Sequence, residues 1–339
     1  PLGITGIFGP SGAGKTSLLH AIAGLVSPQK GKISLGDKVL FDREQKINLA
    51  VEKRNIGYVF QEGRLFPHMS VEKNLLYGFK KGVEPKVSFE EVVQLLGLTA
   101  LLNSKPSQIS GGERQRTALG RSLLSSPDIL LLDEPFSAVD MNLRQQILPF
   151  IIRIQERVGV PILVVSHDLP DLLKLSEQLF LMKEGKCIGH GAYHELLKKP
   201  ELREVFGNSS LVNAIEMEVV EVDIKRGLNL LRWKNEEQEV WIKSEQATAS
   251  YRRGQKIKIF IHANDIALSH EKLPQLSIQN QIKGRVKDLI QRDATWLCII
   301  DAGFKLVVEI TAESQKRMDI QTGNEIWCLF KSVAIDVAG

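Results

Sequence analysis

The sequence predicts two domains, an α/β domain with a largely parallel sheet followed by a smaller all-β domain. Its 339 residues, 43% apolar and 25% charged, are enough for two cores of ordinary globular composition. Up to about residue 207, short apolar runs alternate with longer helical patterns, whereas residues 208–339 contain short alternating stretches separated by turn residues. This change of pattern sets the predicted boundary.

Five short apolar runs in residues 1–207 are expected to be strands of the parallel sheet. They span residues 4–8, 56–60, 129–132, 162–165 and 178–182. The region of about 62–127 is expected to form a helical subdomain.

The second domain is predicted to contain two similar halves, about 210–270 and 277–337. Ser-Leu-Val-Asn at 210–213 is echoed by Ser-Ile-Gln-Asn at 277–280. Further along, Gly254 with Ile257 matches Gly323 with Ile326 at a nearly equal offset. Polar and apolar positions both match, which favours a true duplication over a chance similarity of β-rich segments.

Charge and cysteine content exclude several classes of protein. The net charge is only +4 with both signs mixed along the chain, so the chain lacks the clustered basic face typical of nucleic-acid binding. Three widely spaced cysteines indicate neither a disulfide framework nor a cysteine-rich zinc site, and a reducing, cytoplasmic setting fits best. Since the apolar runs are strand-sized, we expect any membrane role to act through a partner.

A phosphate-binding motif begins directly after the first predicted strand. It reads G-x-x-x-x-G-K-[ST] and consists of Gly9, Pro10, Ser11, Gly12, Ala13, Gly14, Lys15 and Thr16. Its backbone N–H groups converge on phosphate oxygens at the start of a helix. We expect the loop to wrap a polyphosphate, with Lys15 meeting its β and γ phosphates and the Thr16 hydroxyl binding Mg²⁺.

Two adjacent acids follow the buried run 129–132, at the end of a parallel strand where ligands bind. Asp133 is expected to bind Mg²⁺, and Glu134 is expected to be the base that polarises the attacking water. The pair predicts in-line transfer of a phosphoryl group to water.

A second set of helix N-terminal amides begins at Ser110, followed by Gly111 and Gly112. Here the chain resembles the ATP-binding-cassette family, whose LSGGQ element corresponds to Ile-Ser-Gly-Gly-Glu at 109–113. The resemblance implies that Ser110 and Gly112, with Gly111 between them, bind the γ-phosphate of ATP held by the other subunit. A functional site would then require a head-to-tail homodimer.

Other family elements appear in the expected order. The resemblance implies that Gln61 senses Mg²⁺ and the transport partner, Asp140 communicates across the dimer, and His167 contacts the γ-phosphate. The family also stacks adenine on an aromatic residue upstream of the phosphate-binding motif, and only eight residues precede Gly9. Either the protein extends further upstream or this stacking is lost.

The segment 54–61, together with 65–71, resembles the importer branch of the family. In that branch the loop after Gln61 receives a short helix of the membrane permease, which implies such a role for Leu65, Phe66 and Pro67. The alternative is a hydrophobic loop that only anchors itself.

The segments 277–286 and 330–333 resemble the Mop-type molybdate-binding module, which implies an OB-like, duplicated barrel of the Mop or TOBE type. Its hydroxyl, amide and ammonium donors suit a tetrahedral dianion and are Ser277, Asn280, Lys331 and Ser332. The usual Ser-Ala-Arg-Asn is altered at Ile278 and Gln279, which puts the anion affinity in doubt. A barrel that only dimerises is the alternative.

Taken together, the motifs resemble the ATP-binding subunits of molybdate importers. The resemblance implies two copies on the cytoplasmic face of the inner membrane, under a permease supplied by a periplasmic or extracellular oxyanion-binding protein. Molybdate or tungstate would be the cargo and a regulatory ligand, and the two are nearly alike in charge and shape. An importer of another substrate such as sulfate remains an alternative. A soluble cassette protein acting on DNA or ribosomes normally carries two motor units, and this chain has one phosphate-binding motif.

Overall fold

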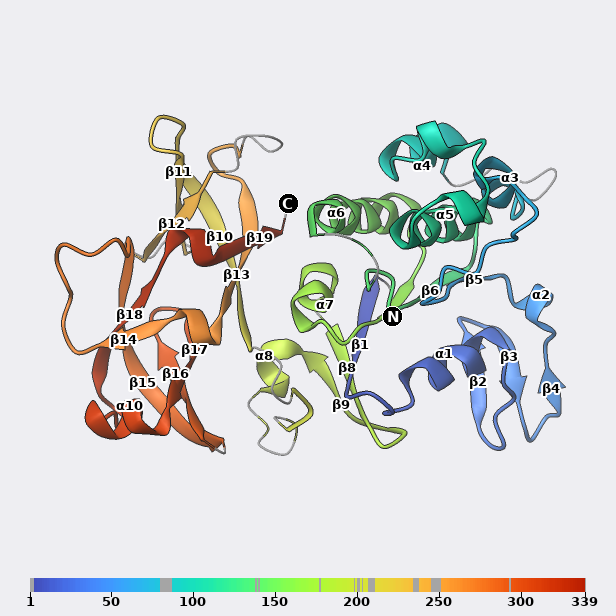
Figure 1. Cartoon of the computed structure of the whole chain (residues 1–339). Helices are drawn as coiled ribbons and strands as arrows, with labels where there is room; N and C mark the ends of the chain where they lie inside the picture. Colours follow the sequence, from blue (N-terminus) through green and yellow to red (C-terminus); the bar gives the residue numbers. More distant parts are fainter. Residues whose placement is uncertain are drawn as a thin grey trace. The chain divides into compact units, whose positions relative to one another are not determined.

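The computed structural model divides the chain into two compact units, residues 1–207 and 208–339, which are drawn in Figure 1. The residues that the structure describes are 3–79, 87–137, 139, 141–176, 178–197, 199, 202, 204–206, 211–233, 238–244, 251–292 and 294–338. No helix in these ranges is long and apolar enough to span a bilayer.

A six-stranded sheet with the strand order β5-β6-β7-β1-β8-β9 forms the centre of the first unit. Its strands are β1 (Ile4–Phe8), β5 (Ile56–Val59), β6 (Ile129–Asp133), β7 (Ile162–Val165), β8 (Gln178–Lys183) and β9 (Lys186–Ala192). The first five are parallel, and β9 pairs antiparallel with β8 at the edge. The predicted parallel sheet is therefore confirmed, and its carboxyl ends meet at one edge.

Helices cover both faces of this sheet. On one face, Leu19 and Ala23 of α1 (Lys15–Ala23) pack with Ile7 of β1. On the other, Gly6 leaves room for Leu172 of α7 (Leu169–Leu175), whose side chain would lie 3.3 Å from an added Cβ. Alternating strand residues thus contact different helices, as a sheet buried on both faces requires.

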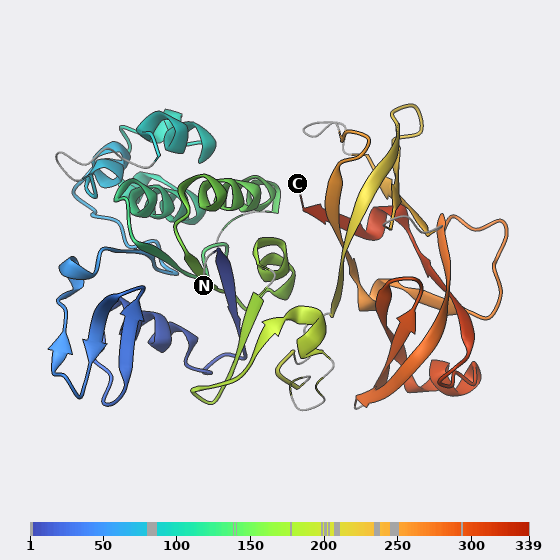
Figure 2. The ribbon, with the colours of Figure 1, turned by 180° about the vertical axis from the view of Figure 1, so that it is seen from behind.

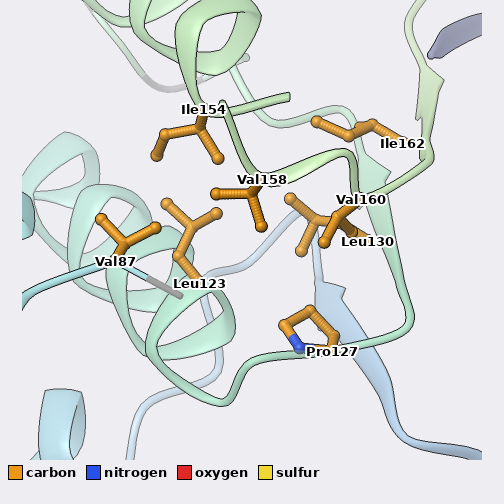
Figure 3. A pocket seen from close by; sticks show the side chains of 8 residues that line it. All are labelled: Val87, Leu123, Pro127, Leu130, Ile154, Val158, Val160 and Ile162. Atoms are coloured by element: carbon orange, nitrogen blue, oxygen red, sulfur yellow. The ribbon is translucent and has the colours of Figure 1, made fainter. Parts of the chain in front are cut away.

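The helical region contains α3 (Val71–Leu76), α4 (Phe89–Leu95) and α5 (Gly111–Leu124), with short 3₁₀ turns at Thr99–Leu101 and Pro106–Gln108. Helix α5 packs against α3, α4 and β5. It lies close to α6 (Met141–Val158) in both views, from the front and from behind (Figure 1 and Figure 2). Between these two helices and the sheet, apolar side chains line a cavity of about 10 Å³ (Figure 3).

A small antiparallel sheet, which the sequence patterns did not indicate, follows α1. It contains β2 (Lys32–Leu35), β3 (Lys38–Asp42) and β4 (Ile47–Asn48). The next helix, α2 (Val51–Arg54), ends in a buried arginine whose guanidinium donates to the carbonyls of Ala21 and Ile22. Arg54 therefore adds donors to two carbonyls at the end of α1, of which that of Ala21 also accepts from the Gly24 N–H at 3.2 Å. The unit closes with α8 (Tyr193–Leu196) and a 3₁₀ turn at Glu204–Phe206.

The second unit contains two five-stranded sheets, with the orders β12-β11-β10-β13-β19 and β14-β18-β15-β16-β17. The first consists of β10 (Val212–Asp223), β11 (Leu228–Arg232), β12 (Glu239–Lys243), β13 (Lys256–His262) and β19 (Ile335–Ala338). The second consists of β14 (Ala267–Ser269), β15 (Asn280–Arg292), β16 (Thr295–Asp301), β17 (Lys305–Thr311) and β18 (Glu325–Phe330), with α10 (Ala312–Arg317) between β17 and β18. Every pairing described in the two sheets is antiparallel.

The two sheets exchange strands and share one hydrophobic core. The last strand, β19, completes the first sheet, while β14 joins the second. Equivalent irregularities occur in the long strands, between Val219 and Glu221 in β10 and between Val286 and Asp288 in β15. The same pairing pattern thus occurs twice, once in each half of the unit.

Candidate active site

The phosphate-binding loop connects β1 to α1. An added Cβ at Gly9 would lie 2.2 Å from the carbonyl oxygen of Met182, so only glycine fits. Gly14 caps α1 with a φ of 90°, a backbone conformation that residues with side chains rarely adopt. The loop is held from outside by a hydrogen bond of 3.0 Å from the Gly185 N–H to the Ala13 carbonyl. Such a loop presents its N–H groups to an anion at the helix start.

Lys15 is buried inside this loop. Its ammonium donates to the carbonyl of Gly9 at 2.7 Å and to that of Pro10 at 3.0 Å. Burial lowers the pKa of Lys15, and the negative charges of Glu134 and Asp133 partly oppose this shift. A cation held among carboxylates and carbonyls is well placed to meet a polyphosphate.

Asp133 ends β6 with its carboxylate almost wholly buried. One oxygen, Oδ1, accepts from the Thr16 hydroxyl at 3.1 Å. The other, Oδ2, accepts from the Tyr58 hydroxyl at 3.2 Å. A carboxylate and a hydroxyl in contact are oxygen ligands of the kind that Mg²⁺ takes in sites it shares with phosphates, so these residues fit the ion.

Glu134 follows with a φ of 50°, in the left-handed region. Its N–H donates to the Val165 carbonyl at 2.9 Å, which ties it to the end of β7. Its Oε2 lies 2.8 Å from Nδ1 of His167. The structure therefore brings together two predicted catalytic side chains, and the His167 ring remains mostly exposed beside them.

The helix that carries Ser110 begins with a capping box. Glu113 N–H donates to the Ser110 hydroxyl at 3.3 Å, and the Ser110 N–H donates to Glu113 Oε2 at 2.7 Å. This second bond chiefly holds the pKa of Glu113 below its ordinary value. A glutamate at this position thus fixes the start of α5. No described hydrogen bond joins residues 110–112 to residues 9–16 of the same chain.

Gln61 lies exposed in the turn directly after β5, and the described contacts give its side chain no hydrogen bond. Asp140, the proposed contact across the dimer, lies outside the described residues. Two site residues were not singled out from the sequence. They are Tyr58, at the end of β5, and Gln115, whose Nε2 donates to the Glu134 carbonyl at 2.9 Å.

The loop after Gln61 is held by a buried asparagine. The Asn74 side chain accepts from the Phe66 N–H and donates to the carbonyls of Phe66, Met69 and Ser70. The Phe66 ring lies 4.2 Å from that of Tyr77, which is 59% exposed. The loop is thus anchored by Asn74, while Leu65 and Phe66 stay half-buried and Pro67 is exposed.

The four candidate oxyanion residues of the second unit differ in their availability. Ser277 and Lys331 are exposed, whereas Asn280 and Ser332 are buried. The Asn280 side-chain oxygen accepts from the Trp241 N–H, and the Asn280 side-chain nitrogen donates to the Trp241 carbonyl. These two bonds use the amide oxygen and one of the two amide N–H groups of Asn280. The Ser332 hydroxyl donates to Gln279 Oε1 at 2.5 Å. Asn280 therefore has a structural role, and the Ser332 hydroxyl already donates its hydrogen bond to Gln279.

Comparison with protein families finds two matches in this chain. Residues 2–137 match the model of the ABC transporter family. Residues 276–337 match the model of the TOBE domain.

Individual relatives extend the likeness over nearly the whole chain. A molybdenum import ATP-binding protein, ModC, from Haemophilus ducreyi is 38% identical over 98% of this chain and 93% of its own length. The protein of the same name from Rhodospirillum rubrum is 36% identical over 98% of this chain and 91% of its own length. A solved structure, cbiO1 from Clostridium perfringens, is 26% identical and covers 61% of this chain and 84% of its own, with a TM-score of 0.49.

Proposed function

This chain belongs to the ABC transporter family, and on that premise we propose that it is the ATP-hydrolysing subunit of an importer for molybdate or tungstate. The observation that carries the hydrolytic part is the contact of Glu134 with His167 beside the Asp133 and Thr16 pair. The molybdate part rests on relatives named for molybdenum import that align over 98% of this chain, including its second unit.

Each residue of the site has a distinct task in hydrolysis. Lys15 and the loop amides bind the β and γ phosphates, while Thr16 and Asp133 hold Mg²⁺, which neutralises phosphate charge when bound. Glu134 accepts the proton of the attacking water. His167, in contact with Glu134 through Nδ1, orients that carboxylate and contacts the γ-phosphate with its remaining nitrogen. Gln61 completes the metal shell.

A second copy of the chain supplies Ser110 and its glycines to each site. Two observations support this proposal: Ser110 is exposed at the start of α5, and no described hydrogen bond joins it to the nucleotide loop of its own chain. In the dimer, Asp140 communicates between the two sites. The homodimer sits on the cytoplasmic face of the inner membrane and docks a permease helix at Leu65 to Pro67, and the permease receives oxyanion from a binding protein outside.

Mixing two inactive variants tests this arrangement. Lys15→Ala removes the phosphate cation of one composite site, and in a mixed dimer Ser110→Arg of the partner damages the other half of that same site. Heterodimers of the two should regain ATPase activity, because they contain one intact composite site. The measurement is ATP turnover after co-purification through two different tags. Verified heterodimers that remain as inactive as each parent would contradict the head-to-tail dimer.

The second unit is proposed to bind molybdate or tungstate as a regulatory ligand through Ser277, Lys331 and Ser332. Exposed hydroxyl and ammonium donors support this role. An importer of sulfate is the second candidate, since every motor residue would be the same. Uptake assays with radiolabelled molybdate, tungstate and sulfate in membranes containing the permease separate the two.

A further inference from the structure

Gln115 connects two parts of the hydrolytic machinery that the motifs treat separately. It lies in the second turn of α5, on the helix that begins at Ser110, and its side chain is 2% exposed. Its Nε2 donates at 2.9 Å to the backbone carbonyl of Glu134. Its Oε1 is buried and has no hydrogen-bond partner among the described residues. The Gln115 side-chain amide is therefore buried although it makes one described hydrogen bond, the one to the Glu134 carbonyl, and burial of a polar group is costly where its other atoms have no partner.

The carbonyl that Gln115 holds belongs to a strained residue. Glu134 has a φ of 50°, which is unfavourable for any residue with a side chain. Such a conformation persists only where its surroundings determine it. The N–H of Glu134 donates to the Val165 carbonyl. Its own carbonyl accepts from the Gln115 side chain, from the Ser137 hydroxyl at 3.1 Å and from the Ser137 N–H at 3.3 Å. These four bonds set the direction in which the carboxylate leaves the backbone.

The loop after Gln61 meets the same point of α5. Gly63, with a φ of 60°, approaches so closely that an added Cβ would lie 3.2 Å from the backbone nitrogen of Gln115. Near its start, α5 thus lies close both to the loop after Gln61 and to the backbone of Glu134. A displacement of α5 would be transmitted directly to Glu134.

We propose that Gln115 is a positioning residue that holds Glu134 of its own chain, so that one helix serves both nucleotide sites of the dimer. The N-terminus of α5 binds the nucleotide of the partner's site, while Gln115 sets the base of its own site. This inference rests on the proposed head-to-tail dimer. It predicts that damage at Gln115 impairs the site of its own chain, whereas damage at Ser110 impairs the opposite one.

The mixed dimers described above test this directly, because they contain a single live site. That site uses Glu134 of the Ser110→Arg chain and the intact α5 start of the Lys15→Ala chain. Gln115→Met, which keeps the side-chain length but cannot donate, is placed in one chain or the other. In the Ser110→Arg chain it should lower turnover about tenfold, since slight misplacement of a catalytic group has such effects. In the Lys15→Ala chain it should leave turnover within about twofold.

Three controls make the result decisive. Gln94→Met, at an exposed position of α4, should leave both mixtures unchanged. In the homodimer, Gln115→Met should lower kcat with little change in KM for ATP, as expected when a bound substrate meets a misplaced base. Gln115→Glu can donate only when protonated, so its activity relative to wild type should rise as the pH is lowered.

The reverse placement effect would overturn the inference, because it would mean that Gln115 only supports the α5 start used by the partner. Equal losses in both mixtures would also overturn it. If the mixture without any Gln115 substitution stays inactive, the head-to-tail dimer itself fails, which is a distinguishable outcome. If Gln115→Met does not fold, Gln115→Glu takes its place in the mixed dimers, and a pH-dependent loss confined to the Ser110→Arg chain still supports the inference, whereas a loss confined to the Lys15→Ala chain overturns it.

Discussion

At the residue scale, the Asp133 carboxylate has both oxygens engaged within its own chain. The Thr16 hydroxyl donates to one oxygen, and the Tyr58 hydroxyl donates to the other. The Tyr58 ring lies between neighbours, 4.1 Å from the centre of Phe60 and 5.7 Å from that of His20. Burial, with the adjacent Asp133 charge, raises the pKa of Tyr58 far above its ordinary value. The phenol therefore stays a donor and fixes the carboxylate.

Tyr58→Phe should weaken Mg²⁺ binding at the ATP site without removing either of the expected ligands, Thr16 and Asp133. Groups that orient a metal ligand typically affect metal affinity or activity about 10- to 100-fold, so we expect the Mg²⁺ concentration for half-maximal ATPase activity to rise about tenfold. Mn²⁺ binding in the presence of a non-hydrolysable ATP analogue, followed by electron paramagnetic resonance, should weaken in parallel. Tyr251→Phe, in the second unit, is the matched control. An unaltered Mg²⁺ requirement would exclude this role for Tyr58.

Glu134→Gln should separate nucleotide binding from hydrolysis. Glutamine keeps the size of the side chain but cannot take a proton from water, so turnover should fall by at least about 10²-fold. ATP binding should persist, because Lys15 and the loop amides are untouched, and the variant should accumulate as an ATP-bound dimer on gel filtration. Near-normal turnover with the permease present would show that another residue is the base.

The sequence reveals the residues of this site better than their partners. Lys15 and Asp133 are identified because motif and strand pattern are local. Tyr58 and Gln115 are not, since their partners lie far from them along the chain or on another element. Such contacts arise only when β5 and α5 pack against the end of β6. No periodic pattern in the sequence predicts these contacts between β5, α5 and β6.

At the element scale, the same limit explains the small sheet β2-β3-β4. Its strands are short, and β2 alternates exposed and half-buried residues from Lys32 to Leu35, so no apolar run marks it. The parallel strands of the main sheet were predictable because both of their faces are buried. β6, for example, is buried at every position from Ile129 to Asp133.

Helix α7 is joined to α6 by a charged cluster that makes the stability of the first unit depend on pH. Arg144 donates to Asp171 at 3.0 Å and to Asp168 at 3.2 Å. Burial, followed by the charge of Asp168, raises the pKa of Asp171 from 3.8 to about 6, although Arg144 opposes the shift. In the intervening pH range the folded chain keeps a proton that the unfolded chain has released. The contribution of Asp171 to stability is therefore greatest in acid and falls as the pH rises through this window.

Asp171→Asn should remove this dependence while keeping an oxygen for Arg144. Relative to wild type, the variant should gain stability as the pH rises from about 4 to about 6, by up to about 3 kcal/mol, since one pKa unit corresponds to about 1.4 kcal/mol. The measurement is urea unfolding of both proteins at several pH values, followed by a probe in the first unit. Parallel pH profiles of the two proteins would contradict the shift.

At the scale of the whole molecule, the second unit shows how a duplicated pattern is joined into one body. Asn213, at the start of β10, exchanges hydrogen bonds with both backbone groups of Val307 on β17. Asn280, at the start of β15, does the same with Trp241 on β12. Each asparagine thus pairs the edge strand of the opposite sheet, where unpaired backbone groups would otherwise remain. Their recurrence in both halves therefore has a structural cause, independent of any ligand.

What differs between the copies is a pair of adjacent residues at the ends of β13 and β18, where His262 is the last residue of β13 and Lys331 follows β18. The second copy has exposed Lys331 and buried Ser332, while the first has His262 and buried Ala263. The first copy thus lacks a hydroxyl and has an imidazole in place of the lysine ammonium. We therefore expect oxyanion binding to depend mainly on the residues of the second copy.

Lys331→Ala should weaken molybdate binding to the full-length protein by roughly 1.5 to 3 kcal/mol, the contribution of a hydrogen bond to a charged group. His262→Ala should change it much less, since the first copy has Ala263 where the second has the Ser332 hydroxyl. Calorimetric titration of both variants with molybdate, alongside wild type with tungstate and sulfate, measures the difference and the preference together. Equal losses in the two variants would remove the asymmetry. Wild type without saturable oxyanion binding would contradict the regulatory role and favour the alternative of a barrel that only dimerises.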